Sequence, residues 1–122
     1  MKPSICVLIS QAPYGTVHAA EAVRHINGAL SEGFDVVAVL VNEGVWLARD
    51  GQQAEGSGFT ALSEALAASL NKPGGPVPRV LADRASLDRR GLTASTLVPG
   101  IEVADSAGIS AAILSTQHLL RF

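Results

Sequence analysis

Two short apolar runs, separated by one segment of helix length, constrain the fold more than any other feature of the chain. Ser4 to Ile9 and Val36 to Val41 are apolar at successive positions, which is typical of strands covered on both faces in a parallel sheet. Between them, Val23, Ile26 and Leu30 recur at three- and four-residue spacing, which predicts an amphipathic helix. A strand, helix, strand unit places its two strands parallel in one sheet. The chain is therefore expected to be an α/β protein.

The rest of the chain continues this alternation. Thr16 is predicted to cap the first helix, which runs to about Ser31 and ends before Gly33. We expect further helices through Phe59, Leu62, Leu66 and Leu70, over Asp83 to Arg90 and over Asp105 to Ser115, and further strands at Val77 to Ala82, Ile101 to Val103 and His118 to Phe122. This alternation predicts that residues 1–122 form one doubly wound domain with a mainly parallel five-stranded sheet.

Charge is unusually sparse in this chain. Charged residues make up 16% of it, whereas roughly 25% is usual, and 48% is hydrophobic. We therefore expect part of the surface to be buried against other subunits. A net charge of −2 provides no field that draws the protein to nucleic acid, so no direct nucleic-acid contact is expected.

Cysteine usage and apolar run length bear on the compartment. With one Cys, no disulfide forms within the chain, and a cytoplasmic location is expected. No apolar run is long enough to span a bilayer, so no membrane association is expected.

Ligands of parallel α/β sheets bind beyond the carboxyl ends of the strands, which here points to residues 10–15, 42–46 and 82–86. Tyr14 and Trp46, each the only residue of its type, lie in two of these loops. They either pack locally or anchor an interface. The loop from Ser10 to Thr16 offers backbone N–H groups to an anion, but it lacks the repeated glycines and the lysine of phosphate-binding fingerprints.

Cys6 and the histidines give no sign of chemistry. Cys6 lies within the first strand, away from any helix N-terminus or cation, so it is interpreted as a small apolar core side chain. His18 and His25 are seven residues apart, roughly 10 Å along a helix axis, whereas helical metal pairs are three or four apart. No metal site is expected, even with Glu21 on the same helix face.

Arg79, Arg84, Arg89 and Arg90 form a local basic cluster in which Asp83 and Asp88 are interleaved. This pattern predicts a solvated helix face with local ion pairs. Asp83 is interpreted as a helix N-cap rather than a catalytic carboxylate. No nucleophile, base and orienting group occur together, so no independent catalytic activity is expected.

Four segments together resemble the DsrE/DsrF family of sulfur-relay proteins, and especially its DsrF/TusC branch. They are Ala12-Pro-Tyr-Gly-Thr16, Glu43-Gly-Val-Trp46, Asp83-Arg-Ala-Ser-Leu-Asp-Arg-Arg-Gly-Leu92 and Leu120-Arg-Phe122, and Gly51-Gln52 with Gly56-Ser-Gly58 also fits the branch. Each motif is short, but their order and spacing cover nearly the whole chain.

The resemblance implies a flavodoxin-like domain that assembles with related DsrE/TusD-like and DsrH/TusB-like subunits. The carrier subunit of that family holds a persulfide on a cysteine that begins the helix after the third strand. Matching Ser86-Leu87 and Arg90-Gly91-Leu92 to the family pattern places Asp83 at or within one residue of that cysteine. Aspartate cannot carry a persulfide, so the resemblance implies no direct sulfur transfer, no cofactor and a scaffold role.

Under this hypothesis the chain is a non-catalytic subunit of a cytoplasmic sulfur relay, serving tRNA 2-thiouridine synthesis or dissimilatory sulfur oxidation, with indirect contact to a small sulfur-carrier protein. The alternative is a stand-alone homo-oligomeric protein of the same fold that binds a small anion or nucleotide at the first loop. The residues expected to form interface or pocket loops are Pro13, Tyr14, Gly15, Thr16, Glu43, Gly44, Trp46, Arg84 and Ser86.

Overall fold

Five parallel strands form one sheet in the computed structural model, which describes residues 2–52 and 61–122. The strands are β1 (Ser4–Ile9), β2 (Asp35–Leu40), β3 (Arg79–Asp83), β4 (Glu102–Ala104) and β5 (His118–Arg121). Their order across the sheet is β4-β3-β2-β1-β5, and every pairing is parallel. The predicted five-stranded α/β architecture is confirmed, although the strand order differs from the 2-1-3-4-5 order of flavodoxin itself.

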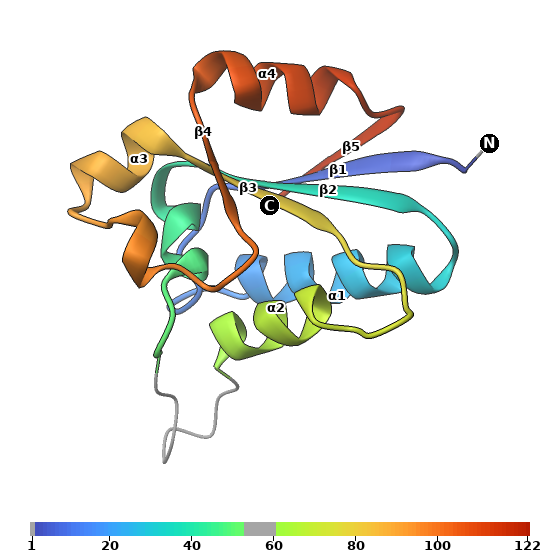
Figure 1. The fold of residues 1–122 in the computed structure, drawn as a ribbon, viewed down its shortest axis with the longest axis horizontal. Helices are drawn as coiled ribbons and strands as arrows, with labels where there is room; N and C mark the ends of the chain where they lie inside the picture. Colours follow the sequence, from blue (N-terminus) through green and yellow to red (C-terminus); the bar gives the residue numbers. More distant parts are fainter. Residues whose placement is uncertain (1, 53–60) are drawn as a thin grey trace.

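Helices cover both faces of the sheet. Figure 1 shows α1 (His18–Ser31) and α2 (Leu62–Leu70) below the sheet and α4 (Ser106–Leu114) above it. The short helix α3 (Arg84–Arg89) lies beyond the carboxyl end of β3. Two 3-10 helices, η1 (Asn42–Ala48) and η2 (Ala94–Thr96), complete the described elements. The molecule is therefore a three-layer αβα structure.

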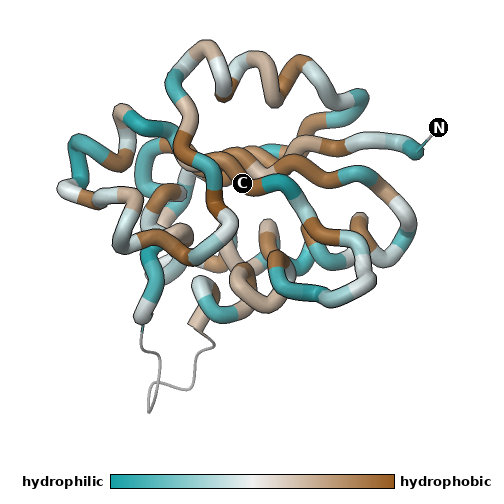
Figure 2. Tube along the Cα trace, in the orientation of Figure 1, coloured by the Kyte–Doolittle hydropathy of each residue, from teal (hydrophilic) through white to brown (hydrophobic). Residues whose placement is uncertain are grey.

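The hydrophobic core lies in two parts, one on each side of the sheet. Side chains of a strand alternate between its faces, so Val7 and Ile9 pack in the larger part with Ile26 of α1, whereas Cys6 packs in the smaller part with Ile109 of α4. Figure 2 shows the apolar residues concentrated in the central strands. This two-sided burial explains why the first two strands are continuous apolar runs.

The predicted cap of the first helix is wrong. α1 begins at His18, and its N-cap is Val17, which makes no side-chain cap hydrogen bond. Gly15 turns the chain with a φ of 96°, a conformation that favours glycine, and Thr16 remains exposed two residues before the helix. Because α1 begins two residues after Thr16, the Thr16 side chain does not stand at the N-cap position.

The third strand begins later than predicted. β3 pairs with β2 from Arg79 onward, whereas Val77 is 49% exposed. Pro78 has no N–H to donate to a sheet, which explains the delayed start. Residues 42–46, expected to be a loop, lie within η1. The remaining elements agree with prediction to within a residue where they are described, and Phe59 lies outside the described residues.

Candidate functional site

The first three strands end at one edge of the sheet. β1 leads into residues 10–17, β2 into η1 and β3 into α3. Because the strands are parallel, these segments gather at the carboxyl edge, on the left of Figure 1. The structure places the predicted loop residues at this edge, but it divides them between a hydrogen-bonded network and a separate cavity.

Asp83 and Ser86 form the centre of the network. Asp83 is the N-cap of α3, and its Oδ2 accepts hydrogen bonds from the backbone N–H of Ser86 at 3.1 Å and from the Ser86 hydroxyl at 2.6 Å. Ser86 is buried, and its Oγ in turn accepts from the backbone N–H of Asn42 at 2.9 Å. The predicted capping role of Asp83 is confirmed. This carboxylate therefore fixes α3 to the start of η1.

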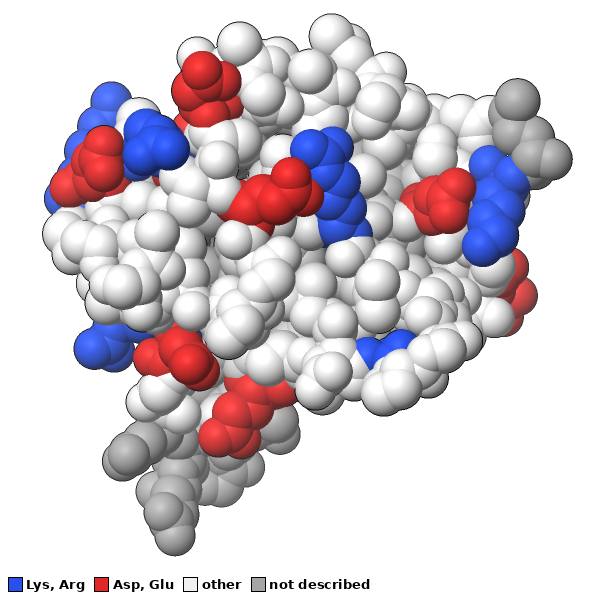
Figure 3. Space-filling model, in the orientation of Figure 1, with Lys and Arg blue, Asp and Glu red and all other residues white. Residues whose placement is uncertain are grey.

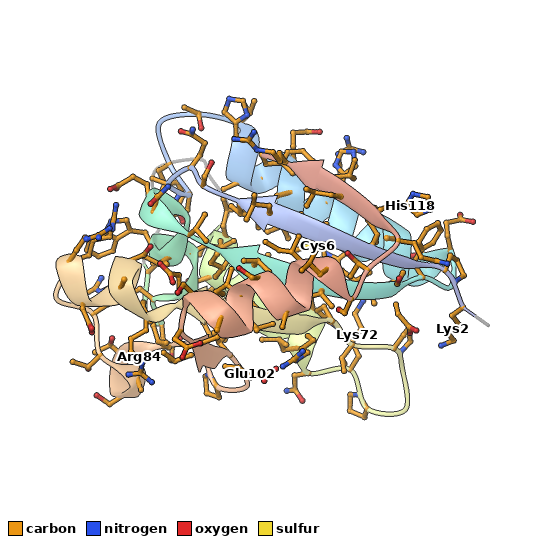
Figure 4. The ribbon with its side chains drawn as sticks, turned by 90° about the horizontal axis from the view of Figure 1, so that it is seen from above. Lys2, Cys6, Lys72, Arg84, Glu102 and His118 are labelled. Carbon is orange, nitrogen blue, oxygen red and sulfur yellow. The ribbon has the colours of Figure 1, made fainter. Side chains whose placement is uncertain are left out.

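Arg90 adds a second connection between α3 and η1. Its Nε and Nη2 donate to Glu43 Oε1 at 3.0 and 2.6 Å, and its Nη1 donates to the carbonyl of Ser86 at 3.0 Å. The predicted local ion pairs with Asp83 and Asp88 are not among those found in the described residues. The arginine side chains are long enough to reach other elements, and Arg79 likewise pairs with Glu102 of β4. Arg84 is exposed on the outer side of α3, far from Cys6 (Figure 4).

Gly44 has a steric role in the Glu43-Gly-Val-Trp46 motif. A Cβ built on Gly44 would lie 2.0 Å from the carbonyl oxygen of Ile9 and 2.7 Å from its carbon. The backbone of η1 therefore lies directly against the end of β1, an approach that only glycine permits. Packing against β1 therefore explains why glycine stands at this position of the motif.

Removing the Ser86 hydroxyl is expected to weaken this edge. Ser86→Ala leaves the Asn42 N–H without its acceptor and Asp83 with one bond fewer, so the free energy of unfolding should fall by about 1–2 kcal/mol. Urea unfolding measures this change. Ser110→Ala, at an exposed position of α4, is the matched control and should change stability by less than about 0.5 kcal/mol. Equal effects of the two changes would contradict the network's role.

A cavity of about 250 Å³ lies beside η1, and Ala12, Pro13, Tyr14, Trp46, Arg49 and Gln52 line it. Sequence interpretation placed Pro13, Tyr14 and Trp46 at this edge, and the cavity brings them together. Gly15 and Thr16, also predicted, do not line it among the residues described. Ala12 and Gln52 lie in the family motifs but were not predicted as site residues, and Arg49 was missed because it lies in no motif.

Cys6 is enclosed, as predicted. It is 0% exposed, and it packs with Val39, Leu81 and two side chains of α4. Figure 4 shows it beneath α4 in the middle of the sheet. Burial raises the pKa of its thiol to about 11, because desolvation disfavours the thiolate. The only thiol of the chain is therefore neither accessible nor ionised near neutral pH.

Two polar side chains of α1, Glu21 and His25, have partners within the helix. Glu21 pairs with Arg24 at 2.5 Å, which lowers the pKa of that carboxyl, and the Nδ1 of His25 lies 2.7 Å from the Glu21 carbonyl oxygen. Over residues 2–52 and 61–122, no three His, Cys, Asp or Glu side chains are grouped as metal ligands. Within the same residues, no helix has the length and apolar character needed to cross a membrane.

The fold and this edge define a class: small three-layer α/β proteins in which a capped helix follows the third strand of a parallel sheet. Residues 3–122 match the DsrE/DsrF-like family, and the chain belongs to this family. The resemblance seen in the sequence motifs is thereby confirmed.

Two curated proteins are similar over part of their length. The intracellular sulfur oxidation protein DsrF of Allochromatium vinosum is 33% identical over 88 residues, which cover 72% of this chain and 62% of DsrF. The uncharacterized protein MK0008 of Methanopyrus kandleri is 43% identical over 51 residues, or 42% of each chain. The matches thus span less than two thirds of either relative.

Two solved structures share the fold over essentially the whole chain. The YchN protein of E. coli has a TM-score of 0.75 at 25% identity, with 100% of both chains covered. MTH1491 of Methanobacterium thermoautotrophicum, a protein of unknown function, has a TM-score of 0.69 at 15% identity, over 99% of this chain and 100% of its own. The second likeness concerns the fold alone.

Proposed function

We propose that this protein is a non-catalytic subunit of a cytoplasmic sulfur-relay complex. The proposal rests on two side chains, Asp83 and Cys6, neither of which can carry a persulfide. Asp83 stands at the N-cap of α3, where the family resemblance implies a carrier cysteine, and the only thiol, Cys6, is enclosed under α4. The chain therefore has no group suited to hold a persulfide, and its role is to support a neighbour that does.

Related DsrE/TusD-like and DsrH/TusB-like subunits are the proposed partners. Support comes from α4, which contains no charged residue: in Figure 3 the region of α4 at the top of the view is free of charged side chains apart from one acidic group near its left end. Leu114 of α4 is 83% exposed, and Leu119 of β5 is 47% exposed. An uncharged helix with an exposed leucine, beside an edge strand with another, is typical of a surface buried in an assembly.

Sulfur oxidation is the pathway that the similarity to DsrF favours, and tRNA 2-thiouridine synthesis is the alternative within the same scheme. In either pathway, contact with the small sulfur-carrier protein is indirect, through the carrier subunit. Affinity purification of the tagged protein from its native cells tests the proposal. It should recover two related subunits of similar size, one of which carries an alkylatable cysteine.

The proposed correspondence of Asp83 with the carrier position gives a sharper test. Asp83→Cys places a thiol at the start of α3, where backbone N–H groups point outward and favour a thiolate. Loss of the aspartate cap should cost about 1 kcal/mol, which an ordinary domain tolerates. We expect this variant to accept persulfide from a sulfurtransferase donor, with a mass increase of one sulfur atom, whereas the wild-type protein does not.

Asp88→Cys is the matched control, because Asp88 is exposed on the same helix but away from its first residues. Its thiol should react at the rate of an ordinary exposed cysteine. A wild-type protein that takes up stable, transferable sulfur on Cys6 would contradict the scaffold role. Equal persulfide uptake by the two variants would contradict the assignment of Asp83.

A second candidate is a stand-alone homo-oligomer of the same fold. The cavity lined by Pro13, Tyr14 and Arg49 favours it, because a ligand site at the first loop needs no partner subunit. The purification above separates the two functions, since recovery of this polypeptide alone as a stable oligomer supports self-association and opposes the relay complex.

A further inference from the structure

The cavity beside η1 has walls that are held from three parts of the chain. Gln52 donates its Nε2 to the carbonyl oxygens of Trp46 at 2.5 Å and Arg49 at 3.1 Å, which fixes the turn after η1. The backbone N–H of Leu62 at the start of α2 donates to the Tyr14 hydroxyl at 3.3 Å. The cavity is therefore a formed site rather than a gap between loose loops.

Its lining is almost wholly apolar, and Arg49 is the one charged residue among the described residues that line it. Two of the other lining residues, Tyr14 and Trp46, are aromatic, and Ala12 has the smallest side chain among them. The guanidinium of Arg49 makes none of the ion pairs found in the described residues. The adjacent Asp50 turns its Oδ1 toward the N–H of Gly51, at 2.9 Å, and does not pair with Arg49.

The size of the cavity limits the ligand. Ligand pockets typically enclose about 300–1,000 Å³, and this cavity of about 250 Å³ lies below that range. A flavin or a nucleotide would project out of it, whereas a single ring with one short substituent fits inside. The two aromatic residues of the lining favour a planar body, because aromatic rings gain most from stacked or edge contacts with another ring.

We propose that this cavity binds a small planar monoanion, of the class of aromatic carboxylates, with its ring between Tyr14 and Trp46 and its carboxylate on Arg49. A guanidinium can pair with a carboxylate through two parallel hydrogen bonds. Among the described residues, no carboxylate forms such a pair with Arg49. This site goes beyond the relay role, because it requires neither a partner subunit nor a thiol.

Trp46 reports binding directly, since it is the only tryptophan of the chain. Titration of the purified protein with benzoate should change Trp46 fluorescence saturably, with a dissociation constant of about 1 mM, as expected for a ligand of so few atoms. Benzyl alcohol, a neutral ring of the same size, should bind at least about tenfold more weakly, because it cannot pair with Arg49. Acetate, an anion without a ring, should give no saturable change.

Two variants assign the response to the cavity. Arg49→Gln should weaken benzoate binding about tenfold and leave benzyl alcohol unchanged, whereas Arg89→Gln, on the exposed face of α3, should affect neither. Ala12→Leu should fill the cavity and weaken both rings, with Ala107→Leu on the exposed face of α4 as its control. Circular dichroism verifies that each variant is folded.

Equal affinities for benzoate and benzyl alcohol would overturn the proposal, and so would an unaltered benzoate titration in Arg49→Gln. The absence of any saturable fluorescence change in the wild-type protein would do the same. Each of these results concerns the isolated chain and leaves the relay function untouched. Conversely, failure to recover partner subunits does not affect the cavity.

Discussion

Gly44→Ala is expected to destabilise the protein by more than about 3 kcal/mol, because the added methyl group meets backbone atoms of β1. The new Cβ would lie 2.0 Å from the carbonyl oxygen of Ile9, and neither group sits on a flexible side chain. The clash can be relieved only by separating η1 from β1, which breaks the contact that closes the carboxyl edge. Because domains of this size are stable by about 5–15 kcal/mol, much of the folding free energy would be lost.

The measurement is the midpoint of urea unfolding, followed by circular dichroism. Gly28→Ala is the matched control, because a Cβ at Gly28 in α1 meets nothing within 4 Å and its φ is helical. Alanine favours a helix interior over glycine, so this change should stabilise the protein by about 0.5–1 kcal/mol. A Gly44→Ala variant as stable as the wild type would show that η1 does not lie against β1.

Cys6 in the native protein should resist thiol reagents by at least about a hundredfold compared with the unfolded chain. At pH 8 a thiol with a pKa of about 11 is roughly 0.1% thiolate, whereas one at the reference value of 9.0 is roughly 10%. The side chain is also 0% exposed, so access requires opening of the α4 layer. The rate of reaction with a chromogenic disulfide, in native buffer and in denaturant, measures the difference.

Stability should respond to alkali in the corresponding direction. The pKa of Cys6 is raised in the folded state, so folding favours the neutral thiol, and this stabilisation is complete below pH 9 and declines as the pH rises toward 11. Cys6→Ala removes the titration and serves as the control. Rapid modification of the native wild-type protein would contradict the burial of Cys6 and, with it, the scaffold interpretation.

The sequence predicted best those features that depend on local periodicity. The runs at β1 and β2, the stripe of α1 and the alternation of later elements were all visible, because a covered strand or an amphipathic helix imposes its pattern within a few residues. The cap at Asp83 was also visible, since capping involves residues only three positions apart. Thr16 failed as a cap because the turn at Gly15 places the helix start beyond it.

The pairing of charges was not predictable in the same way. Arg90 was expected to pair within its own segment, but its partner Glu43 lies 47 positions away along the chain. Arg79 likewise pairs with Glu102. A long arginine side chain selects among all acids that the fold brings within reach, and that choice depends on how the strands are ordered.

The sequence by itself determined the class of fold, the enclosure of the only thiol and the presence of an aspartate where the family resemblance implies a carrier cysteine. Only the tertiary structure decided that Gly44 rests on Ile9, that Ser86 connects Asp83 to Asn42, and that Arg49 and Gln52 join Tyr14 and Trp46 around one cavity. The physical reason is distance along the chain: strand and cap patterns arise between near neighbours, whereas these contacts arise where segments far apart in sequence meet at the carboxyl edge of the sheet.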